Sequence, residues 1–142
     1  MSKLSPIPVC TAPQPAAEHG NALPVLHEVR HALERLIACG ESTLIDLKAL
    51  PFGPGDEARL TELLGTGEVH AVVEALGPTV IRETAIPGVW LIDYQTAEGN
   101  RLALHLEVTS VPALLRTQCA DLDTALGRLE ARLSGVEGRQ AA

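Results

Sequence analysis

The stretch R101-L-A-L-H-L-E-V-T109 has the clearest periodicity in this 142-residue chain. Apolar side chains occupy every second position, and alternation with a period of two is typical of a β-strand with one buried face. The inward set is Leu102, Leu104, Leu106 and Val108, and the outward set is Ala103, His105, Glu107 and Thr109. The strand therefore predicts a sheet that is covered on one face, with the other face open to solvent or to a partner.

Other segments with strand or helix patterns extend this prediction. The β-prone runs are residues 42–50, 68–76, 79–86 and 89–94, with strong turn signals at Gly77-Pro78 and Pro87-Gly88. Connections of hairpin length make the strand pairing antiparallel. Apolar residues at helical spacing predict a first helix with the stripe Leu26, Val29, Leu33, Leu36 and Ile37, which ends at Gly40. They also predict a last helix that ends at Gly135 and has the buried stripe Leu122, Leu126, Leu129 and Leu133. A short helix with Asp56 and Glu57 in its first turn lies between them. We predict an α+β fold: an antiparallel sheet of about four to five strands with helices packed on one face.

Proline content and helix-ending glycines set the expected boundaries. Residues 1–20 are rich in proline and alanine and predict a flexible arm, because proline removes a backbone donor and stops helix propagation. Residues 21–135 are expected to form a single domain, and residues 136–142 a flexible tail.

Composition excludes several classes of function. The formal charge is −7 and aromatic residues make up 2% of the chain, which argues against binding to phosphate backbones or stacking on bases. No apolar run is long enough to span a membrane, and the N-terminal segment lacks the compact apolar core of a secretion signal. Cys10, Cys39 and Cys119 have neither disulfide-framework nor zinc-ribbon spacing. We therefore expect a cytoplasmic protein with reduced thiols.

One motif suggests metal chemistry. The segment H27-E-V-R-H31 fits the H-E-x-x-H pattern, in which two histidines bind zinc and the glutamate, here Glu28, activates a water molecule. Glu34 could complete a set of three ligands with His27 and His31. Both histidines, however, lie roughly 130° to 170° from the apolar stripe of their helix, on the polar side. A solvated helix face is the favoured interpretation, and a metal-binding or zinc-dependent hydrolytic protein is the alternative.

The segment R82-E-T-A-I-P-G-V-W90 holds the only tryptophan, directly after a Pro-Gly turn. Trp90 is expected either to pack in the core or on the sheet, since large aromatic residues are usually buried, or to anchor a protein interface, where tryptophan is enriched. Glu83 and Thr84 would rim such an interface.

The sequence also resembles the hydrogenase expression proteins of the HupH/HyaF type. Four segments carry the resemblance, in the family's order: LPVLHEVRHALERL, TLIDLKALPFGPGDEARLTELLGTGEV, LGPTVIRETAIPGVWLIDY and LHLEVTSVPALLRTQCADLDTALGRLEARL, over about residues 23 to 133. The matched positions include Glu68, Glu83, Thr84, Pro87, Gly88, Trp90, Glu107, Val108, Pro112 and Gln118.

The resemblance implies a non-catalytic accessory protein in the maturation of a [NiFe] hydrogenase. Its implied partner is the precursor of the iron–sulfur small subunit, with other maturation proteins as further partners. The resemblance implies no cofactor for the accessory protein itself. Partner contacts are expected at Glu83, Thr84, Pro87, Gly88, Trp90, Glu107 and Gln118. An acidic surface would suit the twin-arginine export signal that such a precursor carries. The sequence does not specify the oligomeric state, and a homo-oligomer is compatible with it.

Overall fold

The computed structural model describes residues 20–141, so nearly all of the expected N-terminal arm lies outside the described residues. The chain divides into two compact units at Ser110 and Val111, and each is described by itself. The elements in chain order are α1 (Ala22–Cys39), β1 (Thr43–Asp46), α2 (Pro54–Leu64), β2 (His70–Glu74), β3 (Pro78–Glu83), β4 (Val89–Gln95), β5 (Arg101–Val108), the 3-10 turn η1 (Ala113–Leu115) and α3 (Cys119–Gln140).

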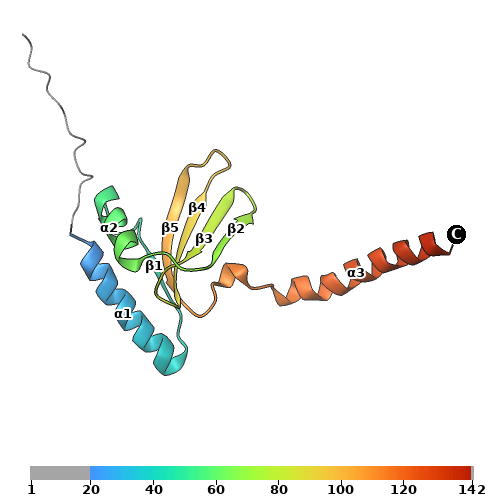
Figure 1. The fold of residues 1–142 in the computed structure, drawn as a ribbon, viewed down its shortest axis with the longest axis horizontal. Coiled ribbons are helices and arrows are strands. Elements are labelled where there is room, and N and C mark those ends of the chain that lie inside the picture. The colour runs from blue at the N-terminus through green and yellow to red at the C-terminus, as the bar shows by residue number, and fades with distance from the viewer. Residues whose placement is uncertain (1–19, 142) are drawn as a thin grey trace, which may run out of the picture. The chain divides into compact units, whose positions relative to one another are not determined.

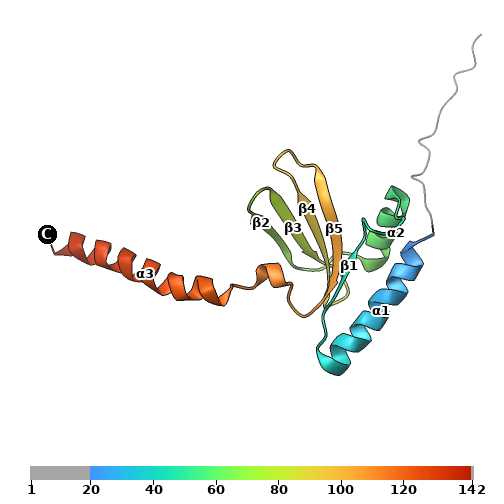
Figure 2. The ribbon, with the colours of Figure 1, turned by 180° about the vertical axis from the view of Figure 1, so that it is seen from behind.

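The first unit is built on a five-stranded sheet with the order β1-β5-β4-β3-β2, in which every neighbouring pair is antiparallel (Figure 1). Strands β2 to β5 follow one another as a meander, and β1 pairs with the far side of β5 (Figure 2). The predicted α+β class, antiparallel pairing and strand number are confirmed.

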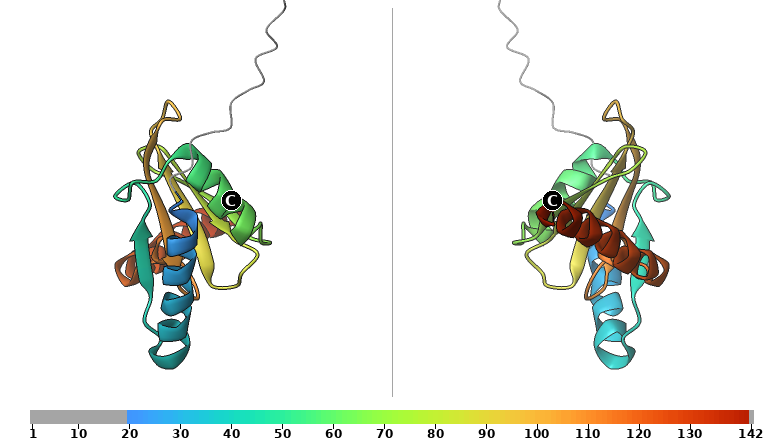
Figure 3. Two further views of the ribbon diagram at one scale, coloured as in Figure 1. Left: turned by 90° about the vertical axis from the view of Figure 1, so that its left-hand side faces the viewer. Right: turned by 90° about the vertical axis from the view of Figure 1, so that its right-hand side faces the viewer.

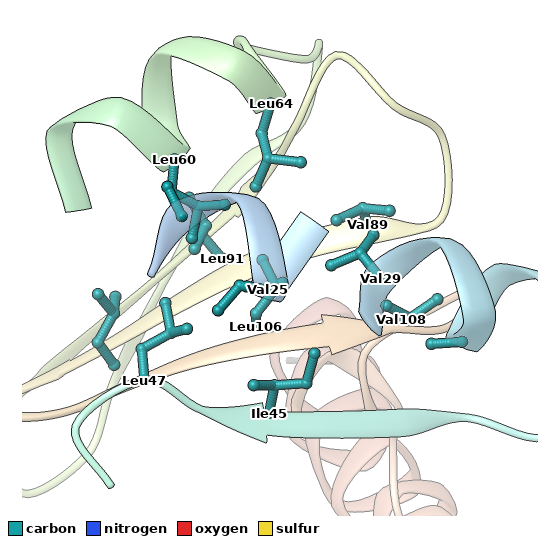
Figure 4. Close-up of a cluster of buried hydrophobic side chains, with 13 residues drawn as sticks. Val25, Val29, Ile45, Leu47, Leu60, Leu64, Val89, Leu91, Leu106 and Val108 are labelled. Atoms are coloured by element: carbon teal, nitrogen blue, oxygen red, sulfur yellow. The ribbon is translucent and has the colours of Figure 1, made fainter. Parts of the chain in front are cut away.

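The core lies between this sheet and the two helices of the first unit. The left panel of Figure 3 shows α1 and α2 in front of the strands, on one face of the sheet. Leu104, Leu106 and Val108 of β5 point into the core, as their alternation predicted. Figure 4 shows Leu106 and Val108 of β5 in one cluster with Val25 and Val29 of α1. The cluster also contains Leu60 and Leu64 of α2. Leu102, predicted to point inward, is 61% exposed, because the register with β4 shifts at this point: Tyr94 pairs with Ala103 and Gln95 with Arg101, which interrupts the alternation at Leu102.

The buried face of α1 differs from the predicted stripe. Its buried residues are Ala22, Val25, Val29 and Ala32, with Leu26, Leu33 and Leu36 partly buried against them. Ile37, predicted to belong to the stripe, is 85% exposed. At about 100° per residue, Ile37 lies roughly 100° from the centre of the buried face, so it projects past the sheet.

Helix α2 begins and ends as its sequence predicts. The Asp56 carboxylate accepts a hydrogen bond from the Gly53 backbone N–H at 3.1 Å and closes a capping box. Asp56 is 1% exposed, and the Asn21 N–H donates to its other oxygen at 3.3 Å, which ties the start of α1 to the start of α2. Gly65 ends the helix with φ of 68°.

The second unit holds η1 and the long helix α3. The leucine stripe of α3 was predicted to be buried, with the helix ending at Gly135, and both expectations are wrong. The five apolar side chains Leu122, Leu126, Leu129, Leu133 and Val136 are 52% to 62% exposed. The helix continues to Gln140 and so includes most of the expected tail. Gly135 does not adopt a positive φ, and a glycine that keeps helical angles lowers helix stability without ending the helix.

Within residues 20–141, no helix combines the length and the apolar character that crossing a bilayer requires.

Candidate functional site: an acidic groove beside the β3–β4 turn

The turn that joins β3 to β4 is fastened to the end of α2. The Ala85 N–H donates to the Leu64 carbonyl at 2.9 Å, and the Gly67 N–H donates to the Glu83 carbonyl at 2.9 Å. The bond from Ala85 satisfies a carbonyl at the end of α2 that has no partner within its own helix. The segment after α2 therefore runs directly alongside the end of β3.

Gly67 allows this close approach. A Cβ atom at Gly67 would lie 2.4 Å from the Thr84 carbonyl oxygen and 3.0 Å from the Glu83 side chain. Any residue larger than glycine would push the two segments apart. Nothing in the sequence pattern distinguishes this glycine from other loop glycines, so its packing role was not predicted.

The same turn is also fastened to β5. The Thr109 N–H donates to the Gly88 carbonyl at 2.9 Å, and Gly88 has φ of 84°, a conformation that favours glycine. Leu33 and Leu36 of α1 would lie within 4 Å of a Cβ atom at Gly88. The Pro-Gly turn is thus held from three sides: by α2, by β5 and by α1.

Thr84 organises the inside of the turn. It is 2% exposed, its N–H donates to the Val89 carbonyl at 3.0 Å, and its hydroxyl oxygen accepts from the Ile86 N–H at 3.2 Å. These are local contacts that fix the backbone of the turn, so Thr84 supports the surface around it.

A groove of about 430 Å³ lies between the segment after α2 and the turn. Its lining residues are Thr66, Gly67, Glu68, Glu83, Thr84, Ala85 and Pro87. The lining contains two carboxylates and no basic side chain. Arg82 lines a smaller neighbouring cavity together with Glu83. The groove is therefore suited to a positively charged group.

Three of the predicted positions form a row across the other face of the sheet. Glu83 pairs with Trp90 on the neighbouring strand, and Trp90 pairs with Glu107 on the next strand. Side chains of directly paired residues lie on the same face, so Trp90 stands between two carboxylates. Trp90 is 6% exposed, and its indole N–H donates to the Thr109 carbonyl at 3.0 Å. Trp90 is therefore packed on the sheet face opposite the helices and lies outside the core cluster, which fits the sheet-packing interpretation.

Two aromatic rings lie in contact further along this face. Tyr94 and His105 meet edge to face with ring centroids 5.1 Å apart. Burial, and then the negative charge of Glu107, raise the pKa of Tyr94. The Nδ1 atom of His105 is buried, and among the described residues no group forms a hydrogen bond with it.

The structure thus brings most of the predicted site residues to one end of the sheet. Glu83, Thr84 and Pro87 line the groove together with Glu68, and Gly88 belongs to the same turn. Trp90 and Glu107 extend from it as a row. Gln118 belongs to the other unit, where it directly precedes α3. The contributions of Thr66, Gly67 and Ala85 were not predicted, because small loop residues carry no chemical signal in a single sequence.

The His-Glu helix face is arranged differently from a metal site. His27 and His31 are exposed, the Nδ1 atom of His31 lies 3.4 Å from a Glu34 carboxylate oxygen, and Arg30 contacts the other oxygen at 3.3 Å. Within residues 20–141 no group of three or more His, Cys, Asp or Glu side chains is placed to hold a metal ion. Glu34 is engaged as the acidic partner of Arg30, in an ordinary i,i+4 pair.

An ion-pair cluster at the opposite end of the strands ties α2 to the sheet. Arg101 donates two hydrogen bonds to Asp93, at 3.0 and 2.9 Å, and its Nη1 lies 2.7 Å from Glu57 of α2. Burial alone would raise the pKa of Asp93, but hydrogen bonds from Arg101 and Gln95 and the charges of nearby arginines outweigh it and lower the pKa of that carboxyl. The cluster stabilises the fold at a distance from the groove.

Fold and groove together define a small α+β module: an antiparallel sheet with helices on one face and an acidic recess beside one turn. Residues 20–136 match the family described as HupH hydrogenase expression protein, C-terminal conserved region, and the chain belongs to this family. The resemblance inferred from the sequence segments is confirmed.

Relatives from several bacteria support this assignment. The chain is 36% identical over 114 residues to the hydrogenase expression/formation protein HoxQ of Azotobacter vinelandii, covering 77% of this chain and 39% of that protein. It is 33% identical over 104 residues to HupH of Rhizobium leguminosarum bv. viciae, covering 72% of this chain and 36% of that protein. The chain therefore spans about two fifths of the length of these curated relatives.

A solved structure extends the likeness to three dimensions. The hydrogenase expression protein HupH from Thiobacillus denitrificans ATCC 25259 superimposes with a TM-score of 0.80 at 41% identity. The match covers 84% of this chain and 99% of that one.

Proposed function

We propose that this chain is a non-catalytic accessory protein in hydrogenase maturation, and that its acidic groove binds the precursor of the hydrogenase small subunit in the cytoplasm. The relatives are named as hydrogenase expression or formation proteins, which supports a role in producing the enzyme. The small subunit as partner follows from the family resemblance.

The groove is the observation that carries the proposal. Glu68 and Glu83 face a recess whose lining has no basic side chain, in a chain of net charge −7. A twin-arginine signal presents two guanidinium groups, which bind carboxylates through paired, charge-assisted hydrogen bonds. Each glutamate can accept one arginine.

The backbone contacts add a second argument. Both walls of the groove are fixed by hydrogen bonds from Ala85 and Gly67 and by the close approach at Gly67. A groove that is already formed loses little conformational entropy when a segment binds, and preorganisation of this kind favours affinity.

The test is titration of the purified chain with small-subunit precursor that carries its signal, at about 50 and 300 mM salt. The Glu68→Gln/Glu83→Gln variant should bind roughly tenfold more weakly at the lower salt, because two charge-assisted contacts become neutral. Glu98→Gln is the matched control, since Glu98 is an exposed carboxylate in the β4–β5 turn, at the other end of the strands. Its affinity should equal that of the unaltered chain.

Two results would contradict the proposal. If the double substitution leaves the affinity unchanged, the groove does not take part in the interaction. Failure of the precursor to bind at either salt concentration would remove the small subunit as the partner.

A further inference from the structure

Helix α3 carries an unbroken heptad pattern. Its exposed apolar residues Leu122, Leu126, Leu129, Leu133 and Val136 follow one another at alternating intervals of four and three. This spacing places them at the a and d positions of successive heptads, with Leu126 and Leu133 at a and Leu122, Leu129 and Val136 at d. Such a seam is narrow and is typical of a helix that pairs with another helix.

The helix needs a partner for its own stability. No residue of α3 is buried, and its 22 residues include Gly127, Gly135 and Gly138. Each glycine costs about 1 kcal/mol of helix stability relative to alanine, and in proteins most of the stability of a helix comes from packing of its amphipathic face. In the heptad frame all three glycines lie at b, c or f, away from the seam, where they do not disturb pairing.

We propose that α3 pairs with α3 of a second copy of this chain as a parallel, two-stranded coiled coil. The seam is self-complementary, since the same leucines serve both helices. This surface lies outside the acidic groove and is independent of the partner that the groove binds.

The flanking charges select the parallel direction. The e positions are Asp123, Glu130 and Glu137, and the g positions are Ala125, Arg132 and Arg139. In a parallel pair, g of one helix faces e of the next heptad on the other, so Arg132 meets Glu137 of the second copy, twice by symmetry. In an antiparallel pair, e faces e and g faces g, which sets carboxylates against carboxylates and arginines against arginines. Among the described residues, no ion pair engages Arg132 or Glu137.

The position of Cys119 gives this geometry a direct readout. Cys119 begins α3 at an a position and is an exposed free thiol. In the parallel pair the two Cys119 side chains face each other across the seam, within the reach of a disulfide. In an antiparallel pair they lie at opposite ends, roughly 30 Å apart, because each residue adds about 1.5 Å.

The experiment uses the full chain with Cys10→Ser and Cys39→Ser, so that Cys119 is the single thiol. Sedimentation equilibrium should give twice the 15.0 kDa mass of one chain. Diamide should then convert most of the protein to a disulfide-linked dimer, since two thiols give up two protons and two electrons to the diazene, which becomes a hydrazine. A monomeric mass at concentrations up to the millimolar range would overturn the proposal.

Substitutions on the seam and beside it sharpen the test. Leu126→Glu should give a monomer and abolish the cross-link, while emission from Trp90, which is buried in the first unit, shows whether that unit remains folded. Arg132→Glu should weaken dimerisation roughly fivefold or more, and adding Glu137→Arg should restore it, because the facing charges are again opposite.

Two further outcomes would overturn the proposal. A dimer that survives Leu126→Glu would be held by another surface, such as a swapped segment on the sheet. A dimer that is lost with Leu126→Glu but forms no Cys119 disulfide would be antiparallel.

Discussion

Replacing Arg101 by methionine should destabilise the first unit mainly by leaving the Asp93 carboxylate without its charged partner. The side chain of Asp93 is 10% exposed and that of Arg101 is 34% exposed, so the pair is largely withdrawn from water. Charge-assisted hydrogen bonds contribute roughly 1.5 to 3 kcal/mol, and the partly exposed contact with Glu57 adds about 0.5 kcal/mol. We expect the free energy of unfolding to fall by about 2 to 3 kcal/mol at pH 7.

The pH dependence of the loss in unfolding free energy identifies its cause. Because the folded-state pKa of Asp93 is lowered, its contribution is fully present above the unfolded-state pKa of about 3.9 and is lost as the pH falls through the folded value. The difference between the variant and the unaltered chain should therefore shrink below about pH 4, where the carboxyl becomes protonated.

Urea denaturation followed by Trp90 fluorescence measures both quantities. Arg59→Met is the matched control, because Arg59 pairs with Glu62 at 3.1 Å on an exposed helix face and should cost at most about 0.5 kcal/mol. In an Asp93→Asn background, Arg101→Met should cost at least 1 kcal/mol less than alone, on the order of other charged couplings. A loss that is equal at pH 7 and pH 3, or unchanged in that background, would refute the reasoning.

Three further substitutions test the packing described above, each by chemical denaturation. Gly67→Ala should lower the free energy of unfolding by about 1 to 3 kcal/mol, because its methyl group would overlap the Thr84 carbonyl; a neutral result would contradict the close approach. Asp56→Ala should lower the free energy of unfolding by about 2 kcal/mol, because it removes a buried helix cap. This loss should be larger than the loss caused by replacing an exposed acidic residue with alanine. Val29→Ala should lower the free energy of unfolding by about 2 kcal/mol, and Ile37→Ala by less than about 0.5 kcal/mol. The reverse order would mean that Ile37 is buried, as the sequence predicted.

The sheet was predictable because its signals are local. Alternation in residues 101–109 and the turn dipeptides Gly77-Pro78 and Pro87-Gly88 identify strands and hairpins without knowledge of the rest of the chain. The pairing of β1 with β5 was not deducible in this way, because it joins segments about 60 residues apart, as in Ile45 with Leu106. Ile37 shows the same limit on a helix, since the sheet decides where the buried face ends.

The candidate site was predictable in part. Glu83 and Thr84 were chosen from the resemblance and from their place beside Trp90, and the structure puts them beside Glu68 across a groove. Glycine at position 67 gave no such signal, because a close backbone approach leaves no trace in sequence except the glycine itself. The stripe of α3 was read correctly as amphipathic, but amphipathicity does not say which surface covers it.

The tethering of the β3–β4 turn also has a kinetic consequence. The amide protons of Gly67, Ala85 and Thr84 are bonded to the carbonyls of Glu83 in β3, Leu64 in α2 and Val89 in β4, so we expect them to exchange with solvent more slowly than the amides of an unbonded loop. Slow exchange at all three positions would indicate that the walls of the groove keep their shape for as long as the unit stays folded.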